Sequence, residues 1–115
     1  MRVIVCGDRN WSDHKVMLRE LKKLPAGAII VEGGCRGADL MAASIAKELG
    51  LIVEEHPAKW GQYGRSAGPI RNREMMDAGA ELVLAFHKDF EHSRGTKDMI
   101  TVARAKGVAT YIYSE

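Results

Sequence analysis

Five short apolar runs divide this chain, and each stretch between two runs is long enough to hold a helix. The first run, residues 2–6, is continuous rather than alternating, which is typical of a strand that is buried on both faces of a parallel sheet. We therefore predict five strands, over residues 2–6, 28–31, 51–53, 81–86 and 108–113.

Apolar residues recur at helical spacing between these runs. The first predicted helix covers residues 16–24 and ends at Pro25 and Gly27, and the second covers residues 38–49 with Gly50 as its C-cap. Two more helices are expected over about residues 69–78 and 95–106. Strands that alternate with helices predict one Rossmann-like α/β domain over residues 1–115, a three-layer sandwich around a five-stranded parallel sheet.

Ligands of such folds bind beyond the carboxyl ends of the strands, so the loops at that edge are the first candidates for a site. The loop within residues 31–40 reads VEGGCRGADL and leads from a strand into a helix. Free N–H groups at a helix start attract anions, glycines allow close approach, and Arg36 adds a charged donor. The loop therefore predicts a phosphate site. The alternative is a tight turn whose glycines are required only for steric reasons.

The loop after the first strand carries a second set of candidates. Gly7 allows a ligand to approach the backbone, and Arg9 is suited to contact a phosphate or a base. Trp11 is expected in the core or at an interface rather than as a stacking platform, and Ser12 or Asp13 is expected to cap the next helix.

The connection over residues 57–68 is long for a link between a strand and a helix. It interleaves Lys59 and Arg65 with Trp60 and Tyr63. Such residues can clamp a nucleotide or a single-stranded base, or they can pack the loop against a partner subunit. The sequence leaves both possibilities open.

Two helix starts complete the candidate site. Arg71 opens the third long helix, where a cation opposes the helix dipole, and this placement favours an anion-binding or substrate-binding role. Ser93, Thr96 and the N–H groups near Gly95 form a second helix start of the phosphate-binding type. Ordinary capping by Ser and Thr is the alternative.

Composition and charge exclude several classes of protein. The apolar content of 46% and the charged content of 28% are those of a soluble globular domain, and a net charge of +2 provides no argument for a dedicated nucleic-acid binder. Cys6, Cys35 and the four histidines lack the spacing of a disulfide scaffold or a zinc site. We expect reduced thiols in the cytoplasm, no metal, no cofactor, and neither a signal peptide nor a membrane span.

Five motifs, in this order along the chain, carry a resemblance to a known family. They are Gly7–Trp11, Glu32–Asp39, Ala67–Met75, Ala85–Phe86 and Ser93–Met99. The motifs resemble the YspA-like branch of the SLOG superfamily, which also includes the cytokinin-activating LOG phosphoribohydrolases and the DNA-processing protein DprA. The resemblance implies a nucleotide-binding domain of a kind found in bacteria and bacteriophages.

The resemblance also bears on whether the protein is an enzyme, which the sequence leaves open. LOG enzymes cleave the N-glycosidic bond of a nucleoside 5′-monophosphate with an arginine at a helix start and a glutamate after a Gly-Thr turn. Arg71 matches that arginine, Asp98 stands at the glutamate position, and Glu74 is a second carboxylate nearby. The Pro-Gly-Gly that precedes the turn in those enzymes is replaced here by residues 91–94, which favours binding over hydrolysis.

Three functions therefore compete. We favour binding of a nucleotide or a nucleotide-derived, NAD-type ligand, in sensing or sequestration, over a LOG-like hydrolase. The third is DprA-like binding of single-stranded DNA through Lys59, Arg65, Arg71 and Arg73, which the mild net charge disfavours. The candidate ligand-binding residues are Gly7, Arg9, Gly33, Gly34, Arg36, Gly37, Asp39, Arg71, Asn72, Ser93, Gly95 and Thr96.

The chain is also expected to associate with itself. Trp60 and Tyr63 in the long loop, with Met75 and Met76 on the next helix, suggest an exposed apolar partner surface. SLOG relatives commonly build their sites beside a dimer interface. We therefore predict a symmetric dimer or a dimer of dimers to which the helix over residues 69–78 contributes.

Overall fold

The computed structural model describes residues 1–114 and contains a five-stranded sheet in which all strands are parallel. The strand order is β3-β2-β1-β4-β5, with β1 paired to β4 so that Val5 lies opposite Leu84. The strands are β1 (Arg2–Gly7), β2 (Ile29–Glu32), β3 (Ile52–Glu55), β4 (Leu82–Phe86) and β5 (Ala109–Tyr113). Each lies within about a residue or two of its predicted position, and the Rossmann-like α/β prediction is confirmed.

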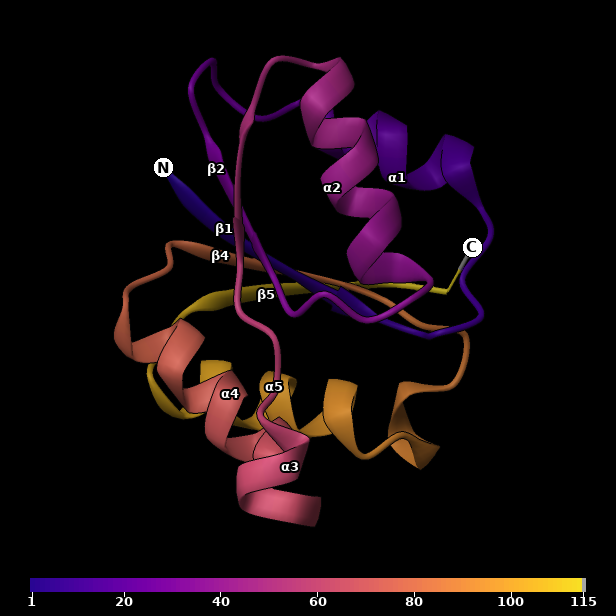
Figure 1. The fold of residues 1–115 in the computed structure, drawn as a ribbon. Helices are drawn as coiled ribbons and strands as arrows, with labels where there is room; N and C mark the ends of the chain where they lie inside the picture. Colours follow the sequence, from indigo (N-terminus) through magenta and orange to yellow (C-terminus); the bar gives the residue numbers. More distant parts are fainter. Residues whose placement is uncertain (115) are drawn as a thin grey trace.

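Helices cover both faces of the sheet (Figure 1). The helices α1 (His14–Leu21) and α2 (Ala38–Glu48) lie on one face, and α4 (Ala67–Asp77) and α5 (Gly95–Ala105) lie on the other. Side chains alternate between the faces along β1, so Val3 and Val5 join the core beneath α1 and α2 while Ile4 joins the core beneath α4 and α5. Burial on both faces explains why this strand is a continuous apolar run.

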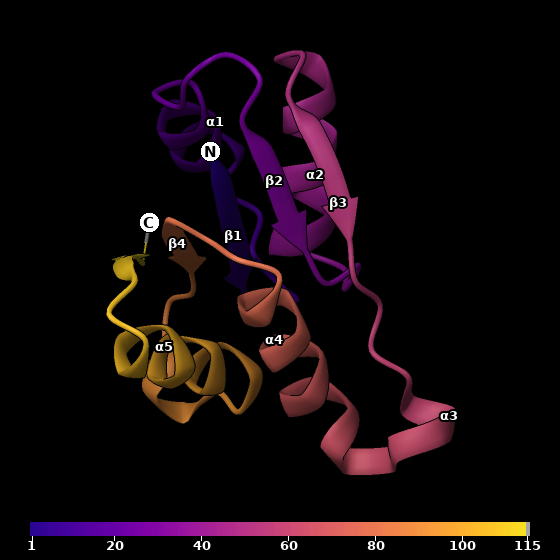
Figure 2. The same ribbon diagram turned by 90° about the vertical axis from the view of Figure 1, so that its left-hand side faces the viewer.

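The long connection after β3 is structured, where the sequence predicted a loop. It contains a short helix, α3 (Trp60–Tyr63), and a 3₁₀ turn (Gly64–Ser66) that leads directly into α4. Helix α4 consequently begins at Ala67, two residues before the predicted start. Pro69 fits there because N–H groups in the first turn of a helix have no intrahelical acceptor. Figure 2 shows α3 projecting from the body of the domain.

Other differences from prediction are small. Asp13 is the N-cap of α1, and its carboxylate accepts a hydrogen bond from the Val16 N–H at 3.2 Å. Helix α1 ends at Leu21 rather than at residue 24. Residues 22–24 form a turn in which the Leu24 N–H donates to the Leu21 carbonyl. Trp11 lies in the core, which is one of the two locations predicted for it. No helix within residues 1–114 combines the length and apolarity needed to cross a membrane.

Strand order determines where a ligand can enter. The chain leaves β1 toward β2 on one side, while β4 lies on the other side of β1, so the loops that follow β1 and β4 diverge. This divergence is the topological switch point at which open α/β sheets bind their ligands.

Candidate functional site

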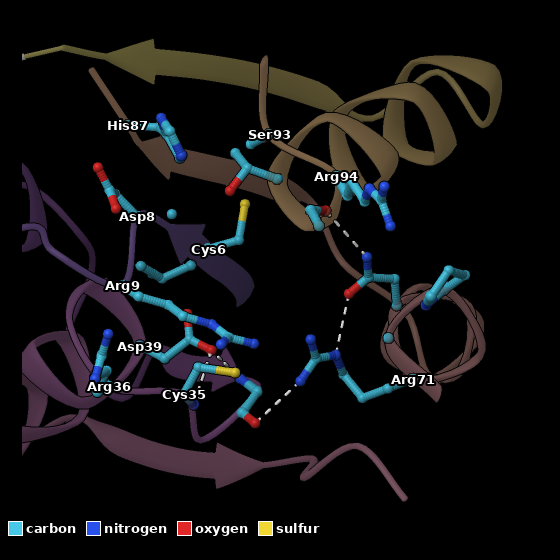
Figure 3. A pocket seen from close by; sticks show the side chains of 18 of the residues that line it. Cys6, Asp8, Arg9, Cys35, Arg36, Asp39, Arg71, His87, Ser93 and Arg94 are labelled. Atoms are coloured by element: carbon cyan, nitrogen blue, oxygen red, sulfur yellow. Dashed lines mark hydrogen bonds between the residues drawn. The ribbon is translucent and has the colours of Figure 1, made fainter. Parts of the chain in front are cut away.

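A cavity of about 550 Å³ lies at the switch point, between the carboxyl ends of the strands and the starts of α4 and α5 (Figure 3). Its volume falls within the range of small-molecule sites. The structure brings together ten of the twelve candidate ligand-binding residues in its lining. These ten are Gly7, Arg9, Gly33, Arg36, Asp39, Arg71, Asn72, Ser93, Gly95 and Thr96.

The other two candidates, Gly34 and Gly37, shape the loop from outside the cavity. Gly34 packs against the side chain of Glu55. Gly37 has a φ of 81°, and a Cβ there would overlap the backbone of Asp8 and Arg9. Steric demand therefore accounts for both glycines, as in the alternative interpretation of this loop.

Three N–H groups of the glycine loop are occupied by the chain's own carboxylates. The Gly33 and Cys35 N–H groups both donate to Asp39 Oδ2 at 3.2 Å, and the Gly34 N–H donates to Glu32 Oε1 at 2.9 Å. Asp39 thus holds the position in which a phosphate was expected. Burial raises the pKa of Asp39 to about 6, although the Cys35 N–H and the Arg71 charge oppose this change.

Arg71 is buried in the wall of the cavity and is tied to the same loop. Its Nη1 donates to the Gly33 carbonyl at 3.0 Å and to the His56 carbonyl at 3.4 Å, and its Nε donates to Asn72 Oδ1 at 3.0 Å. A Cβ on Gly33 would overlap the Arg71 guanidinium. Gly33 is therefore required for the position of Arg71 rather than for contact with a phosphate.

Asn72 extends this network to α5. Its Nδ2 donates to the Gly95 carbonyl at 3.3 Å and to Asp98 Oδ2 at 3.0 Å. The chain of bonds runs from the glycine loop through Arg71 and Asn72 to the start of α5 (Figure 3). Three walls of the cavity are consequently held in one geometry.

Free donors lie at the start of α5. The Lys97 N–H donates to Ser93 Oγ and the Asp98 N–H to the Arg94 carbonyl. Within residues 1–114, the Gly95 and Thr96 N–H groups and the Thr96 hydroxyl have no hydrogen-bond partner. Gly95 and Thr96 both line the cavity. This helix start therefore offers unused donors to a ligand.

The structure separates the three candidate catalytic residues. Arg71 lines the cavity, whereas Asp98 and Glu74 do not. Asp98 faces α4, where it accepts the Asn72 bond and lies 3.7 Å from Arg73 Nη1, and Glu74 is exposed. The carboxylates among the lining residues are Asp8 and Asp39.

Sequence analysis missed several lining residues. Asp8 and Arg94 lie next to predicted residues, and His87 begins the loop that carries Ser93, so position in these loops was the available signal. Trp60 and Arg65 also line the cavity, although the sequence left their role open. Figure 3 labels Cys6 and Cys35 at this site, and burial raises the pKa of the Cys6 thiol well above its ordinary value, which keeps it protonated. No group of three or more metal-ligating side chains was found in residues 1–114.

Met75 and Met76 do not form the exposed surface that we expected. Both are buried in the core between α4 and the sheet, against residues such as Ile4 and Val31. They occupy the sheet-facing side of α4, so burial there accounts for their apolar character. Trp60 and Tyr63 are the large side chains of that proposed surface that remain exposed.

The fold and the cavity define a Rossmann-like α/β domain with a small-molecule site at its switch point. The profile of the "YspA, cpYpsA-related SLOG family" matches residues 1–63, more than half of the chain and including the first two site loops. The chain belongs to this family, as its motifs predicted. SLOG membership indicates a nucleotide-related binding or processing role.

A bacteriophage relative supports the assignment over the whole domain. The chain is 37% identical over 116 residues to the "Gene 61 protein" of Mycobacterium phage D29. The match covers 93% of this chain and 91% of that protein. The similarity therefore extends past residue 63 to the starts of α4 and α5.

Proposed function

We propose that this protein binds a phosphorylated nucleotide or a nucleotide-derived, NAD-type molecule in the cavity, in sensing or sequestration. The observation that carries the proposal is the set of unused donors on Gly95 and Thr96 at the start of α5. A helix start with free N–H groups stabilises a phosphate through hydrogen bonds and the helix dipole.

The charge of the lining supports an anionic ligand. Within the described part of the chain, the lining contains five arginines and two carboxylates, those of Asp8 and Asp39. The arginines are Arg9, Arg36, Arg65, Arg71 and Arg94. An excess of cations in a partly enclosed site raises the local concentration of anions.

The phosphate is assigned to α5 rather than to the glycine loop. A phosphate at the loop would have to displace the Asp39 carboxylate from two N–H groups, whereas a phosphate at Gly95 and Thr96 would displace no acceptor. The glycine loop then serves to hold Asp39 and Arg71 in the cavity wall. Arg71 donates to backbone carbonyls, so its charge is not neutralised by a bonded carboxylate there.

Binding is favoured over the two alternatives. A LOG-like hydrolase would use the carboxylate of Asp98 near the reacting carbon, but Asp98 is engaged by Asn72 and lies outside the lining. A cationic groove for single-stranded DNA would need Arg71 at the surface, and this residue is buried and bonded to carbonyls.

Calorimetric titration with AMP, ADP and NAD tests the proposal. Thr96→Val keeps the volume of the side chain and removes the free hydroxyl. A hydrogen bond to a charged group is worth about 1.5–3 kcal/mol, so affinity is expected to fall about tenfold to a hundredfold. Thr101→Val is the matched control, because Thr101 is an exposed residue on the same helix whose hydroxyl donates to the Lys97 carbonyl.

Two results would contradict the proposal. The first is the absence of binding by any of these compounds at millimolar concentration. The second is equal affinity of the wild-type protein and Thr96→Val for every compound that binds, since this would place the phosphate away from α5.

A further inference from the structure

The two tryptophans of this chain lie in opposite environments. Trp11 is 4% exposed and packs against Phe86, with 5.6 Å between the two ring centroids. Its Nε1–H donates to the Asp13 carbonyl. Trp60 is 49% exposed although it lines the cavity. Its helix, α3, contains no buried residue and projects from the domain (Figure 2). Core packing therefore explains Trp11 and does not explain Trp60.

Contacts place Trp60 beside the first turn of α4. The ring atom Cη2 lies 3.4 Å from the position that a Cβ on Gly68 would occupy, so the indole reaches the backbone of this helix. Asn72 follows one helical turn later and donates to the Gly95 carbonyl at the start of α5. One turn of helix rises about 5.4 Å. The indole and the free donors of α5 are thus linked through the first turns of a single helix.

We propose that Trp60 is a stacking platform for the base of the bound nucleotide. The base would lie on the indole while the phosphate lies at Gly95 and Thr96. Arg65 would add a cation on the same arm, which consists of α3 and the 3₁₀ turn Gly64–Ser66. This inference rests on the proposed function and specifies its ligand, because stacking selects compounds with an aromatic base over sugar phosphates. Stacking of a base on an aromatic side chain is tolerant of base identity.

Affinity measurements with AMP and ribose 5-phosphate separate the base from the phosphate. For Trp60→Ala, the affinity for AMP is expected to fall about tenfold to a hundredfold, the range that loss of one stacked base produces. The affinity for ribose 5-phosphate should stay within about twofold. Trp60→Phe should restore most of the AMP affinity. Tyr63→Ala is the control, because Tyr63 is exposed on the same helix and does not line the cavity.

Fluorescence provides a second readout. Saturating AMP should quench the emission of the wild-type protein and leave that of Trp60→Phe, which retains only the buried Trp11, nearly unchanged. Ribose 5-phosphate should quench neither protein. Because Trp60 is exposed, its substitution does not alter the core, so these measurements compare proteins with an intact core.

The outcomes distinguish this inference from the function on which it rests. Equal losses of AMP and ribose 5-phosphate affinity in Trp60→Ala would show that Trp60 only shapes the arm. Unchanged AMP affinity would place the base elsewhere, and either result would overturn the stacking role while leaving the phosphate site intact. If neither compound bound the wild-type protein, the proposed function and this inference would both fail.

Discussion

Glu32 provides a quantitative test of the electrostatics around the cavity. It is the last residue of β2 and is fully buried. Its Oε1 accepts the Gly34 N–H, whereas Oε2 has no hydrogen-bond partner within the described residues. Glu55 lies opposite it in the register of β2 and β3. Burial, together with the charges of Glu55 and Asp39, raises the pKa of Glu32 to about 7 from its ordinary 4.5.

The direction of the pH effect follows from this pKa. Between pH 4.5 and about 7 the folded protein binds more protons at Glu32 than the unfolded chain does, so the free energy of unfolding falls as the pH rises through this window. Each pKa unit is worth about 1.4 kcal/mol. Glu32→Gln keeps an acceptor for Gly34, places a donor at Oε2 and removes the charge. We therefore expect it to be more stable than the wild type at pH 8, by about 1–3 kcal/mol.

Urea unfolding at pH 5, 6, 7 and 8 measures this effect. The advantage of Glu32→Gln should shrink as the pH falls toward 5. Glu20→Gln is a control of opposite sign, because the hydrogen bond from Arg19 is the largest cause of a lowered pKa at the buried Glu20. That variant should be less stable than the wild type at pH 8. The reasoning would be refuted if Glu32→Gln were destabilised at pH 8, or if it showed the same dependence on pH as the wild type.

Two further predictions concern the site wall and the assembly state. Gly33→Ala should push the Arg71 guanidinium out of place and lower nucleotide affinity about tenfold, measured by calorimetry; stability in urea should fall as well, because Arg71 loses its bonds to the Gly33 and His56 carbonyls. Gly61→Ala is the control and should bind the nucleotide normally, because its Cβ would meet no atom within 4 Å. An unchanged nucleotide affinity of Gly33→Ala would mean that Arg71 does not act on the ligand. Light scattering at micromolar concentration should give the mass of a dimer or of a dimer of dimers; a mass of 12.7 kDa with and without AMP would rule out self-association.

The apolar pattern by itself determined the type and order of the elements. Continuous apolar runs such as residues 2–6 report burial on both faces, and helical spacing reports burial on one face. Both are local properties that neighbouring residues encode. The edge of the sheet that carries the cavity also followed, because parallel strands bring their carboxyl ends together. Ten candidate residues therefore meet in one cavity.

Only the tertiary structure decided how the polar groups are paired. The glycine loop looks like a phosphate site in sequence, but Asp39 and Glu32 accept hydrogen bonds from three of its N–H groups, whereas the Gly95 and Thr96 N–H groups remain unused. In the same way, Trp60 joins the cavity because its arm folds against Gly68. Whether a hydrogen bond or side-chain contact forms depends on differences of a few tenths of an ångström in the distance between two atoms, and these atoms often lie in segments far apart in the chain. The pattern of apolar positions in the sequence does not specify those distances. The packing of the elements therefore determines which donors stay free for a ligand.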